Sequence, residues 1–268
     1  MKTTKLLTLA IVLLIFSCKK DEVTTPADTC KVSVIDRGNN NKHTYAYDAA
    51  GKVATMVREF DGSGSGKISK YLYTFTYDNA GLLSKSVWTL DGKANGSETY
   101  VYTNGKISKV SFKDVDGNAG TNSVKYDEAG RIIYFSIETG DPNSDIIQYF
   151  AYDANGIEIK KGIKGFGGSI YFEAVTKPVG VAKSAEQLLS KYNLPYDVLT
   201  GYSWSGNRGD AGTIIEYFVP DANGKLVSAG KDKVTAVKLD VKGFISEITS
   251  IDDAKNSSTE RFTLMNCN

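Results

Sequence analysis

Residues Tyr71-Leu-Tyr-Thr-Phe-Thr-Tyr-Asp-Asn-Ala-Gly81 decide the fold that we expect for this chain. An aromatic side chain stands at every second position, and a tight-turn signal follows. A period of two places the aromatic residues on one face of a β-strand and Leu72, Thr74 and Thr76 on the other face. In the turn, Asp accepts backbone N–H groups and Gly adopts a positive φ without a steric penalty. The stretch is therefore a strand that ends in a turn.

The same pattern, Tyr-Asp-x-x-Gly, recurs along the chain. Full copies end at the glycines of positions 51, 81, 130 and 156, and Tyr102-Thr-Asn-Gly105 is a shortened copy. From position 51 to position 156 these glycines follow one another at intervals of 24 to 30 residues. Such a period indicates one supersecondary unit per repeat. Further turn signals between the copies, such as Asp91-Gly92, make each unit a β-hairpin.

The repeats predict an all-β fold in which consecutive hairpins form an antiparallel meander. We expect a large curved sheet or an open, barrel-like sheet in a single domain over residues 30–268. Regular repeats cover 43–161, an irregular insertion covers 162–212, and degenerate repeats cover 213–266. In the insertion, Ser184-Ala-Glu-Gln187 has the form of a capping box, and Pro195 follows. This pattern predicts one short helix near 184–192 that covers the sheet.

The turn sequences resemble a known repeat. Tyr126-Asp-Glu-Ala-Gly-Arg-Ile132 is similar to the YD repeats of RHS-type bacterial surface proteins. The resemblance covers about 43 to 161, with weaker echoes from 217 to 249. The chain also looks like the small YD-containing lipoproteins of the Bacteroidota, whose activity is unassigned. The resemblance implies a hairpin architecture and implies no activity.

The first 29 residues have the features of an export signal and a tether. Lys2 and Lys5 precede an apolar run from Leu6 to Phe16, which is too short to span a membrane. We therefore expect residues 1–17 to be a signal peptide. Ile15-Phe-Ser-Cys18 resembles a bacterial lipobox, which implies acylation of Cys18, a tether over 18–29 and an anchor in the outer membrane at the cell surface. The alternative is an ordinary signal peptide with an incidental cysteine.

Two further cysteines, Cys30 and Cys267, flank the expected domain. An exported protein with an even number of remaining cysteines is expected to form a disulfide. On the chain-entropy account, closing so long a loop stabilises the fold by about 5 kcal/mol. The alternative is a pair of buried free thiols.

Strands of alternating residues also form membrane-spanning barrels. Here Lys85 is expected to share a strand face with Leu83 and Val87, while Lys106 and Lys109 are expected on opposite faces of another strand. A lysine that faces lipid at the middle of a membrane costs about 2 to 4 kcal/mol. We therefore expect a soluble sheet.

The charge balance argues against nucleic acid as a partner. The chain has 32 basic and 31 acidic side chains, and the expected signal peptide removes Lys2 and Lys5. Polyanion binding depends on clustered Lys and Arg, and no basic stripe is visible in the sequence.

Motifs for catalysis, cofactors or metals are weak. His43 is the only histidine, so a Ser-His-Asp constellation needs it, and we expect it to be structural or solvated. Asp114-Val-Asp-Gly-Asn118 has alternating oxygen ligands but lacks the Gly and Glu of an EF-hand, so a hairpin turn is favoured. Asp252-Asp253 is one of many carboxylate pairs. We predict no metal and no cofactor.

The remaining candidate is an exposed aromatic segment in the insertion. Tyr202, Trp204, Arg208 and Asp210 could form a stacking platform for a sugar ring or a partner protein. The alternative is that Trp204 belongs to the core under a long loop. The sequence thus predicts a non-catalytic binding or structural module for a glycan or protein, with a carbohydrate-active hydrolase as the alternative. The aromatic residues of the repeats look structural, so we look for function between 162 and 212.

Overall fold

The computed structural model describes residues 30–38, 40–61, 64–138, 145–154, 157–180 and 210–267. Within these ranges the chain is built from antiparallel strands. They are β1 Lys31–Asp36, β2 Lys42–Tyr47, β3 Val53–Phe60, β4 Ser69–Tyr77, β5 Leu83–Leu90, β6 Lys93–Thr103, β7 Lys106–Asp114, β8 Ala119–Tyr126, β9 Ile132–Ile137, β10 Ile146–Tyr152, β11 Glu158–Gly165, β12 Ile170–Lys177, β13 Ile214–Pro220, β14 Leu226–Leu239, β15 Ile245–Asp252 and β16 Ser257–Met265.

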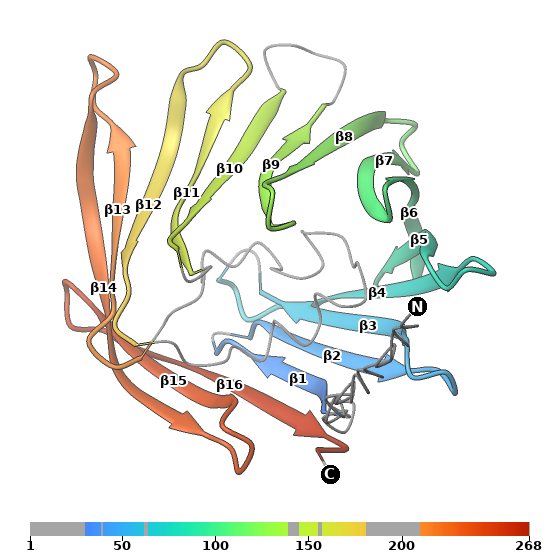
Figure 1. Ribbon diagram of the computed structural model, residues 1–268, viewed down its shortest axis with the longest axis horizontal. Coiled ribbons are helices and arrows are strands. Elements are labelled where there is room, and N and C mark those ends of the chain that lie inside the picture. The colour runs from blue at the N-terminus through green and yellow to red at the C-terminus, as the bar shows by residue number, and fades with distance from the viewer. Residues whose placement is uncertain are drawn as a thin grey trace, which may run out of the picture.

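The strands form a closed barrel and not the open sheet that we expected. Each strand pairs with its neighbours in the sequence, and β1 pairs with β16, so the strands follow one another round a ring (Figure 1). The closing pair runs from Lys31 opposite Met265 to Asp36 opposite Arg261. Closure is favoured because an open sheet leaves unpaired N–H and C=O groups along two edges.

Cys30 and Cys267 are joined by a disulfide at one end of the closing strand pair, in the pairing that the sequence predicts. Cys30 is fully buried and belongs to the apolar core. The covalent bond and the β1–β16 hydrogen bonds therefore hold the same seam of the barrel.

The helix predicted near 184–192 lies outside the described residues. No helix occurs in the described ranges, and consequently none there is long and apolar enough to cross a membrane.

The strand faces follow the expected alternation. In β4, Tyr73 and Phe75 face the interior, while Leu72 and Thr74 are exposed on the outer wall. The inward residues of neighbouring strands join a core of aliphatic and aromatic side chains that includes Met56. The core of this protein therefore lies inside the barrel.

A β-bulge recurs in the strand that follows each Tyr-Asp-x-x-Gly turn. Tyr77 pairs with Leu83, but Thr76 pairs with Lys85, so one residue is inserted after Leu83. Leu83 is fully buried, whereas Lys85 is exposed beside Val87. The predicted shared face of Leu83 and Lys85 is therefore wrong, because the bulge reverses the alternation. Bulges of this kind also bend the strands, which favours closure of the sheet.

The Tyr-Asp-x-x-Gly turns share one hydrogen-bond pattern. In the turn that joins β8 to β9, the Asp127 backbone N–H donates to the Arg131 carbonyl at 2.9 Å, and the Gly130 N–H donates to the Asp127 carbonyl at 2.9 Å. The Asp127 carboxylate accepts the Arg131 backbone N–H at 2.9 Å. The bond from the Arg131 backbone N–H is the main cause of a lowered pKa at the Asp127 carboxylate. Gly130 has φ 84°, which explains the glycine at this position.

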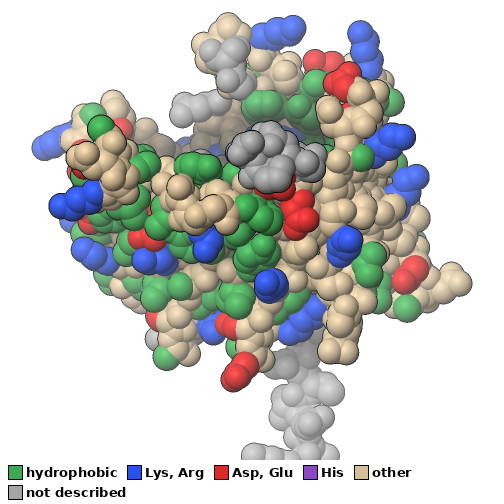
Figure 2. Space-filling view, turned by 90° about the horizontal axis from the view of Figure 1, so that it is seen from above, with side chains coloured by type: hydrophobic (Ala, Val, Ile, Leu, Met, Phe, Trp, Pro, Cys, Tyr) green, Lys and Arg blue, Asp and Glu red, His purple; other side chains and the backbone are tan. Residues whose placement is uncertain are grey.

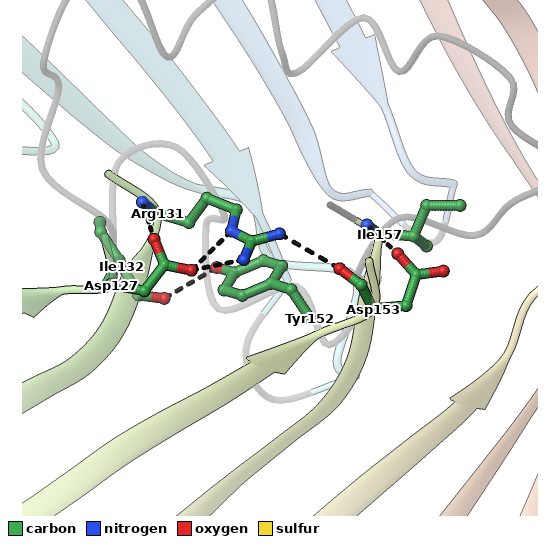
Figure 3. Close-up of polar contacts among 6 residues, drawn as sticks. All are labelled: Asp127, Arg131, Ile132, Tyr152, Asp153 and Ile157. Atoms are coloured by element: carbon green, nitrogen blue, oxygen red, sulfur yellow. Dashed lines mark hydrogen bonds and ion pairs between the residues drawn. The ribbon is translucent and has the colours of Figure 1, made fainter. Parts of the chain in front are cut away.

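In four of the turns the tyrosine is held by an earlier strand or turn of the barrel, as Figure 3 shows for Tyr152. Its hydroxyl donates to the Ile132 carbonyl at 2.8 Å, and the Arg131 guanidinium lies 4.8 Å above its ring. The same guanidinium donates to the Asp153 carbonyl at 3.3 Å. We use the name tyrosine ladder for the four tyrosines whose hydroxyls donate to a backbone carbonyl in this way, Tyr47, Tyr77, Tyr102 and Tyr152.

Candidate functional site

Most of the predicted binding platform falls outside the described residues. This applies to Tyr202, Trp204 and Arg208. Asp210 is described and half-buried; its backbone N–H donates to the Val179 carbonyl at 2.8 Å. Asp210 thus lies where the chain enters β13, close to the end of β12.

His43 is fully buried on the inner face of β2. The Arg37 guanidinium lies 3.3 Å from His43 Nδ1. Burial, followed by the positive charges of Arg37 and Arg58, lowers the pKa of His43 to about 2. The imidazole is therefore neutral at physiological pH and has a structural place in the core.

The acidic motifs considered for calcium or catalysis form hairpin turns. The Asp114 carboxylate accepts the backbone N–H and the side-chain amide of Asn118, both at 2.8 Å. The Asp252 carboxylate accepts the corresponding groups of Asn256 at 2.8 and 2.9 Å. The side-chain bond from Asn256 contributes most to a lowered pKa at Asp252. Both carboxylates therefore stabilise turns, and the described residues contain no group of metal-ligating side chains.

Four aromatic rings line up on the inner wall across β3, β4 and β5. The ring centroids of Phe60 and Tyr71 are 5.7 Å apart, those of Tyr71 and Tyr73 are 6.2 Å apart, and those of Tyr73 and Trp88 are 6.0 Å apart. Their planes differ by only 24° to 32°, so the rings lie nearly parallel. We call these four residues the aromatic strip; all are half-buried.

The strand register and one glycine set the position of Trp88. Tyr73 pairs with Trp88, and Trp88 pairs with Gly96 on β6. A Cβ atom on Gly96 would collide with the indole of Trp88. The absence of a side chain at Gly96 therefore lets the indole lie flat over β6, as aromatic residues do over glycines in curved sheets.

A buried polar group adjoins the strip. Ser86, two residues before Trp88, donates from Oγ to Glu98 Oε2 at 3.0 Å. The Tyr100 hydroxyl donates to the same carboxylate oxygen at 2.5 Å. Glu98 and Tyr100 are 7% and 8% exposed, and Ser86 is fully buried. These hydrogen bonds hold one carboxylate in a fixed position on the wall that carries Trp88.

A cation lies at the other end of the strip. The Arg58 guanidinium carbon is 4.4 Å from the Phe60 ring centroid, a cation–π contact. Arg58 pairs with Tyr71 across β3 and β4, so its charge stands beside the second ring as well. The candidate site therefore combines flat apolar rings with a carboxylate and a guanidinium.

Sequence reasoning placed Tyr71 and Tyr73 on one face but treated their rings as structural. The residues that complete the strip come from other strands, at positions 60 and 88. Two signals in the sequence could have found them. One is the large aromatic residue Trp88 in the strand that follows the tyrosines, and the other is Gly96 in the next strand.

The outer wall carries cations and ion pairs along its strands. Figure 2 shows Lys and Arg side chains spread over the face of the barrel that is turned toward the viewer. Glu247 on β15 bonds Lys238 at 2.7 Å and Arg261 at 3.0 Å. Glu173 on β12 bonds Lys160 at 3.1 Å. Charged groups thus occupy the middle of the wall as well as the turns.

The comparisons with known proteins concern the fold. Neither protein-family profiles nor curated proteins match the chain. Among solved structures, a porin-like protein from Bacteroides uniformis ATCC 8492 is similar, with a TM-score of 0.52 and 14% sequence identity. The match covers 87% of this chain and 98% of that chain.

Two further solved structures are similar with lower TM-scores. A porin-like protein from Bacteroides vulgatus ATCC 8482 has a TM-score of 0.37 at 12% identity, over 87% of this chain and 98% of that chain. TcdB2-TccC3 has a TM-score of 0.31 at 13% identity, over 85% of this chain and 14% of that chain. The likeness to the B. uniformis protein supports an all-β barrel, and the resemblance to YD repeats stays a prediction.

Proposed function

We propose that this protein is a lipid-anchored, water-exposed barrel that binds glycans without catalysis through the aromatic strip. The observation that carries the proposal is the row of nearly parallel rings from Phe60 to Trp88 on the inner wall. Ligand sites in proteins combine apolar and aromatic walls with a few fixed polar groups. Here Glu98 and Arg58 supply those groups.

A sugar suits this arrangement because its two sides differ. The C–H groups on the face of a pyranose ring can pack on flat aromatic rings, while the hydroxyl groups at its edge can donate to a carboxylate. The ring spacings of 5.7 to 6.2 Å place one aromatic contact after another along the strip. We therefore favour a chain of several sugar units over a monosaccharide.

Single-stranded nucleic acid also stacks on aromatic rings, but its phosphates require a positively charged groove. The carboxylate of Glu98, held by Ser86 and Tyr100, stands next to the Trp88 end of the strip. A negative charge at this position disfavours phosphate and is compatible with neutral sugars.

The outer wall supports a water-exposed barrel. The exposed side chains of Lys85 and Lys109 form no ion pair with a described residue. Each would cost about 2 to 4 kcal/mol at the middle of a membrane. We infer that the barrel stands in water and that the acyl chains expected on Cys18 hold it at the outer membrane, on the cell surface.

The glycan proposal can be tested by applying the purified full-length protein in detergent to a glycan array. We expect selected oligosaccharides to bind the wild type and not to bind Trp88→Ala. Tyr134→Ala is the matched control, because Tyr134 is an aromatic residue of β9 with Lys125 above its ring, on the wall remote from the strip. Equal binding by wild type and Trp88→Ala, with both folded, would refute the proposal.

The anchor is tested separately by growing cells with labelled palmitate. We expect the label in the wild type and none in Cys18→Ala. Equal labelling of both proteins would exclude acylation of Cys18, without bearing on the aromatic strip.

A further inference from the structure

The outer wall over β4 to β8 differs from the remainder of the barrel in its charge. The five strands contain two acidic residues, Glu98 and Asp114. Glu98 points inward and is buried, and Asp114 closes the turn to Asn118. None of these five described strands therefore presents a carboxylate on its outer face.

Several exposed lysines stand on this wall. Lys70 on β4 pairs with Glu59 at 3.8 Å, and Lys125 on β8 lies 4.6 Å from the Tyr134 ring centroid. We use the name lysine face for three others, Lys85 on β5, and Lys109 and Lys113 on β7. None of them forms an ion pair with a described residue. On the opposite side of the barrel the acids hold cations in pairs: Glu216 lies 3.3 Å from Lys231 and 3.9 Å from Lys177. The lysine face is thus a region of uncompensated positive charge.

The strand register places hydroxyl groups between the three amines. Lys85 pairs with Thr99, and Thr99 pairs with Ser111, which stands between Lys109 and Lys113 on β7. Lys109 and Lys113 are about 13 Å apart along the strand, and Lys85 lies two strands away, about 10 Å across. The surface between the amines therefore carries the hydroxyls of Thr99 and Ser111 beside the exposed side chains of Val87 and Val101.

We propose that the lysine face binds an acidic polysaccharide that carries carboxylate or sulfate groups. Charge complementarity supports this occupant, because three unpaired amines attract a chain of regularly spaced anions. The hydroxyls of Thr99 and Ser111 can hydrogen-bond to sugar hydroxyls between the charges. Nucleic acid is a poorer match, since the outward residues of β4 to β8 include no arginine and no aromatic ring on which a base could stack.

This surface is independent of the proposed inner site, because it lies on the other side of the barrel wall. Val101 is 51% exposed on the outer face, whereas Tyr100 beside it is buried with Glu98 inside. Loss of one binding activity can therefore be measured while the other is retained.

The experiment is a titration of the full-length protein, held in detergent micelles, with polygalacturonate and with uncharged dextran. We expect the wild type to bind polygalacturonate and not dextran, with affinity that falls as salt is added. The triple variant K85E/K109E/K113E is expected to bind at least about tenfold more weakly, because charge neutralisation supplies most of the affinity for a polyanion.

The control is K225E/K233E/K242E, which changes the net charge by the same amount on β14 and its two flanking turns. These three lysines are also exposed and outside the ion pairs of the described residues. Retained binding in this variant supports the lysine face. Equal loss in both triple variants, or no binding of polygalacturonate by the wild type, would overturn it.

Competition identifies the class of partner. Duplex DNA, or phosphatidylglycerol added to the micelles, is expected to displace polygalacturonate only at much higher charge concentration. Displacement by either competitor at equal charge concentration would overturn the assignment to a polysaccharide.

Discussion

The tyrosine ladder and the aromatic strip use the same kind of residue in two ways, although both start from one strand, β4. At one end of β4, the Tyr77 hydroxyl donates to the Val53 carbonyl at 2.8 Å, and Lys52 lies 4.9 Å above its ring. At the other end, the Tyr71 hydroxyl forms no hydrogen bond with a described residue, and its ring is stacked between Phe60 and Tyr73.

The difference lies in what each side chain contacts. A ladder tyrosine has its hydroxyl bonded to a backbone carbonyl of the barrel, and Tyr47, Tyr77 and Tyr152 also have a cation over the ring. These contacts stabilise the barrel. Tyr71 of the strip, by contrast, has its ring between those of Phe60 and Tyr73. Aromatic alternation alone therefore does not separate the two roles; the partner of the hydroxyl group does.

The largest expected effect concerns the end of the barrel where the ladder begins. In Cys30→Ser/Cys267→Ser the seam between β1 and β16 depends on hydrogen bonds alone. We expect the free energy of unfolding to fall by about 5 kcal/mol, because the loop between the cysteines is very long. Urea denaturation measures the change. An unchanged midpoint would show that the seam does not depend on the disulfide.

Removing one ring from each region compares the ladder with the strip directly. Tyr152→Ala removes a packed ring, its bond to Ile132 and its contact with Arg131. We expect the free energy of unfolding to fall by about 3 kcal/mol. Tyr71→Ala removes only ring contacts, with an expected loss of about 1 kcal/mol. Denaturant unfolding of both variants measures the two decreases in the free energy of unfolding. Equal losses would remove the structural distinction between the two regions.

The variant Gly96→Ala tests how closely the Trp88 indole packs on β6. A methyl group at position 96 collides with the Trp88 indole, so Gly96→Ala must displace the ring. We expect a loss of about 1 to 3 kcal/mol and a change in the emission of Trp88, measured in a Trp204→Phe background. Gly167→Ala is the control, since nothing lies within 4 Å of its new methyl group. Unaltered emission in Gly96→Ala would show that the indole does not lie over Gly96.

The smallest expected effect is a pH dependence of the ladder. Burial, followed by the charge of Asp78, raises the pKa of Tyr102 to about 12. An unfolded tyrosine ionises near pH 10, so the folded state keeps a proton that the unfolded state loses. The contribution of Tyr102 to the free energy of unfolding is therefore complete below pH 10 and is lost as the pH rises toward 12.

Urea midpoints between pH 9 and pH 12 measure this dependence. We expect the wild type to lose stability with rising pH and Tyr102→Phe to lose less, because phenylalanine does not ionise. The same slope in both proteins would show that Tyr102 does not contribute.

Local features of the fold were predictable from the sequence. The alternation in Tyr71–Tyr77 gives the correct strand faces, and Asp127 with Gly130 gives the correct turn, because both depend on residues close together in the chain. Closure was not predictable, because it depends on pairing between Lys31 and Met265 at opposite ends of the domain. The bulge after Leu83 was not predicted because it is a feature of strand pairing. It becomes visible only when the register after the Tyr-Asp-x-x-Gly turns is known, and it reverses the expected face of Lys85.

The candidate site was harder to predict than the fold. Tyr73 and Trp88 become neighbours only through the register of β4 on β5, which the bulge sets. Glu98 is recognisable as an inward carboxylate only once the faces of β6 are known. Of the predicted platform, Asp210 alone lies among the described residues.

Two single-tryptophan proteins show whether glycans bind at the strip. The chain has two tryptophans, so Trp204→Phe reports on Trp88 alone and Trp88→Phe reports on Trp204 alone. Each protein is titrated with the oligosaccharide that binds best on the array. We predict a saturable change in the emission of Trp204→Phe and none in Trp88→Phe. A change in Trp88→Phe with none in Trp204→Phe would contradict the account.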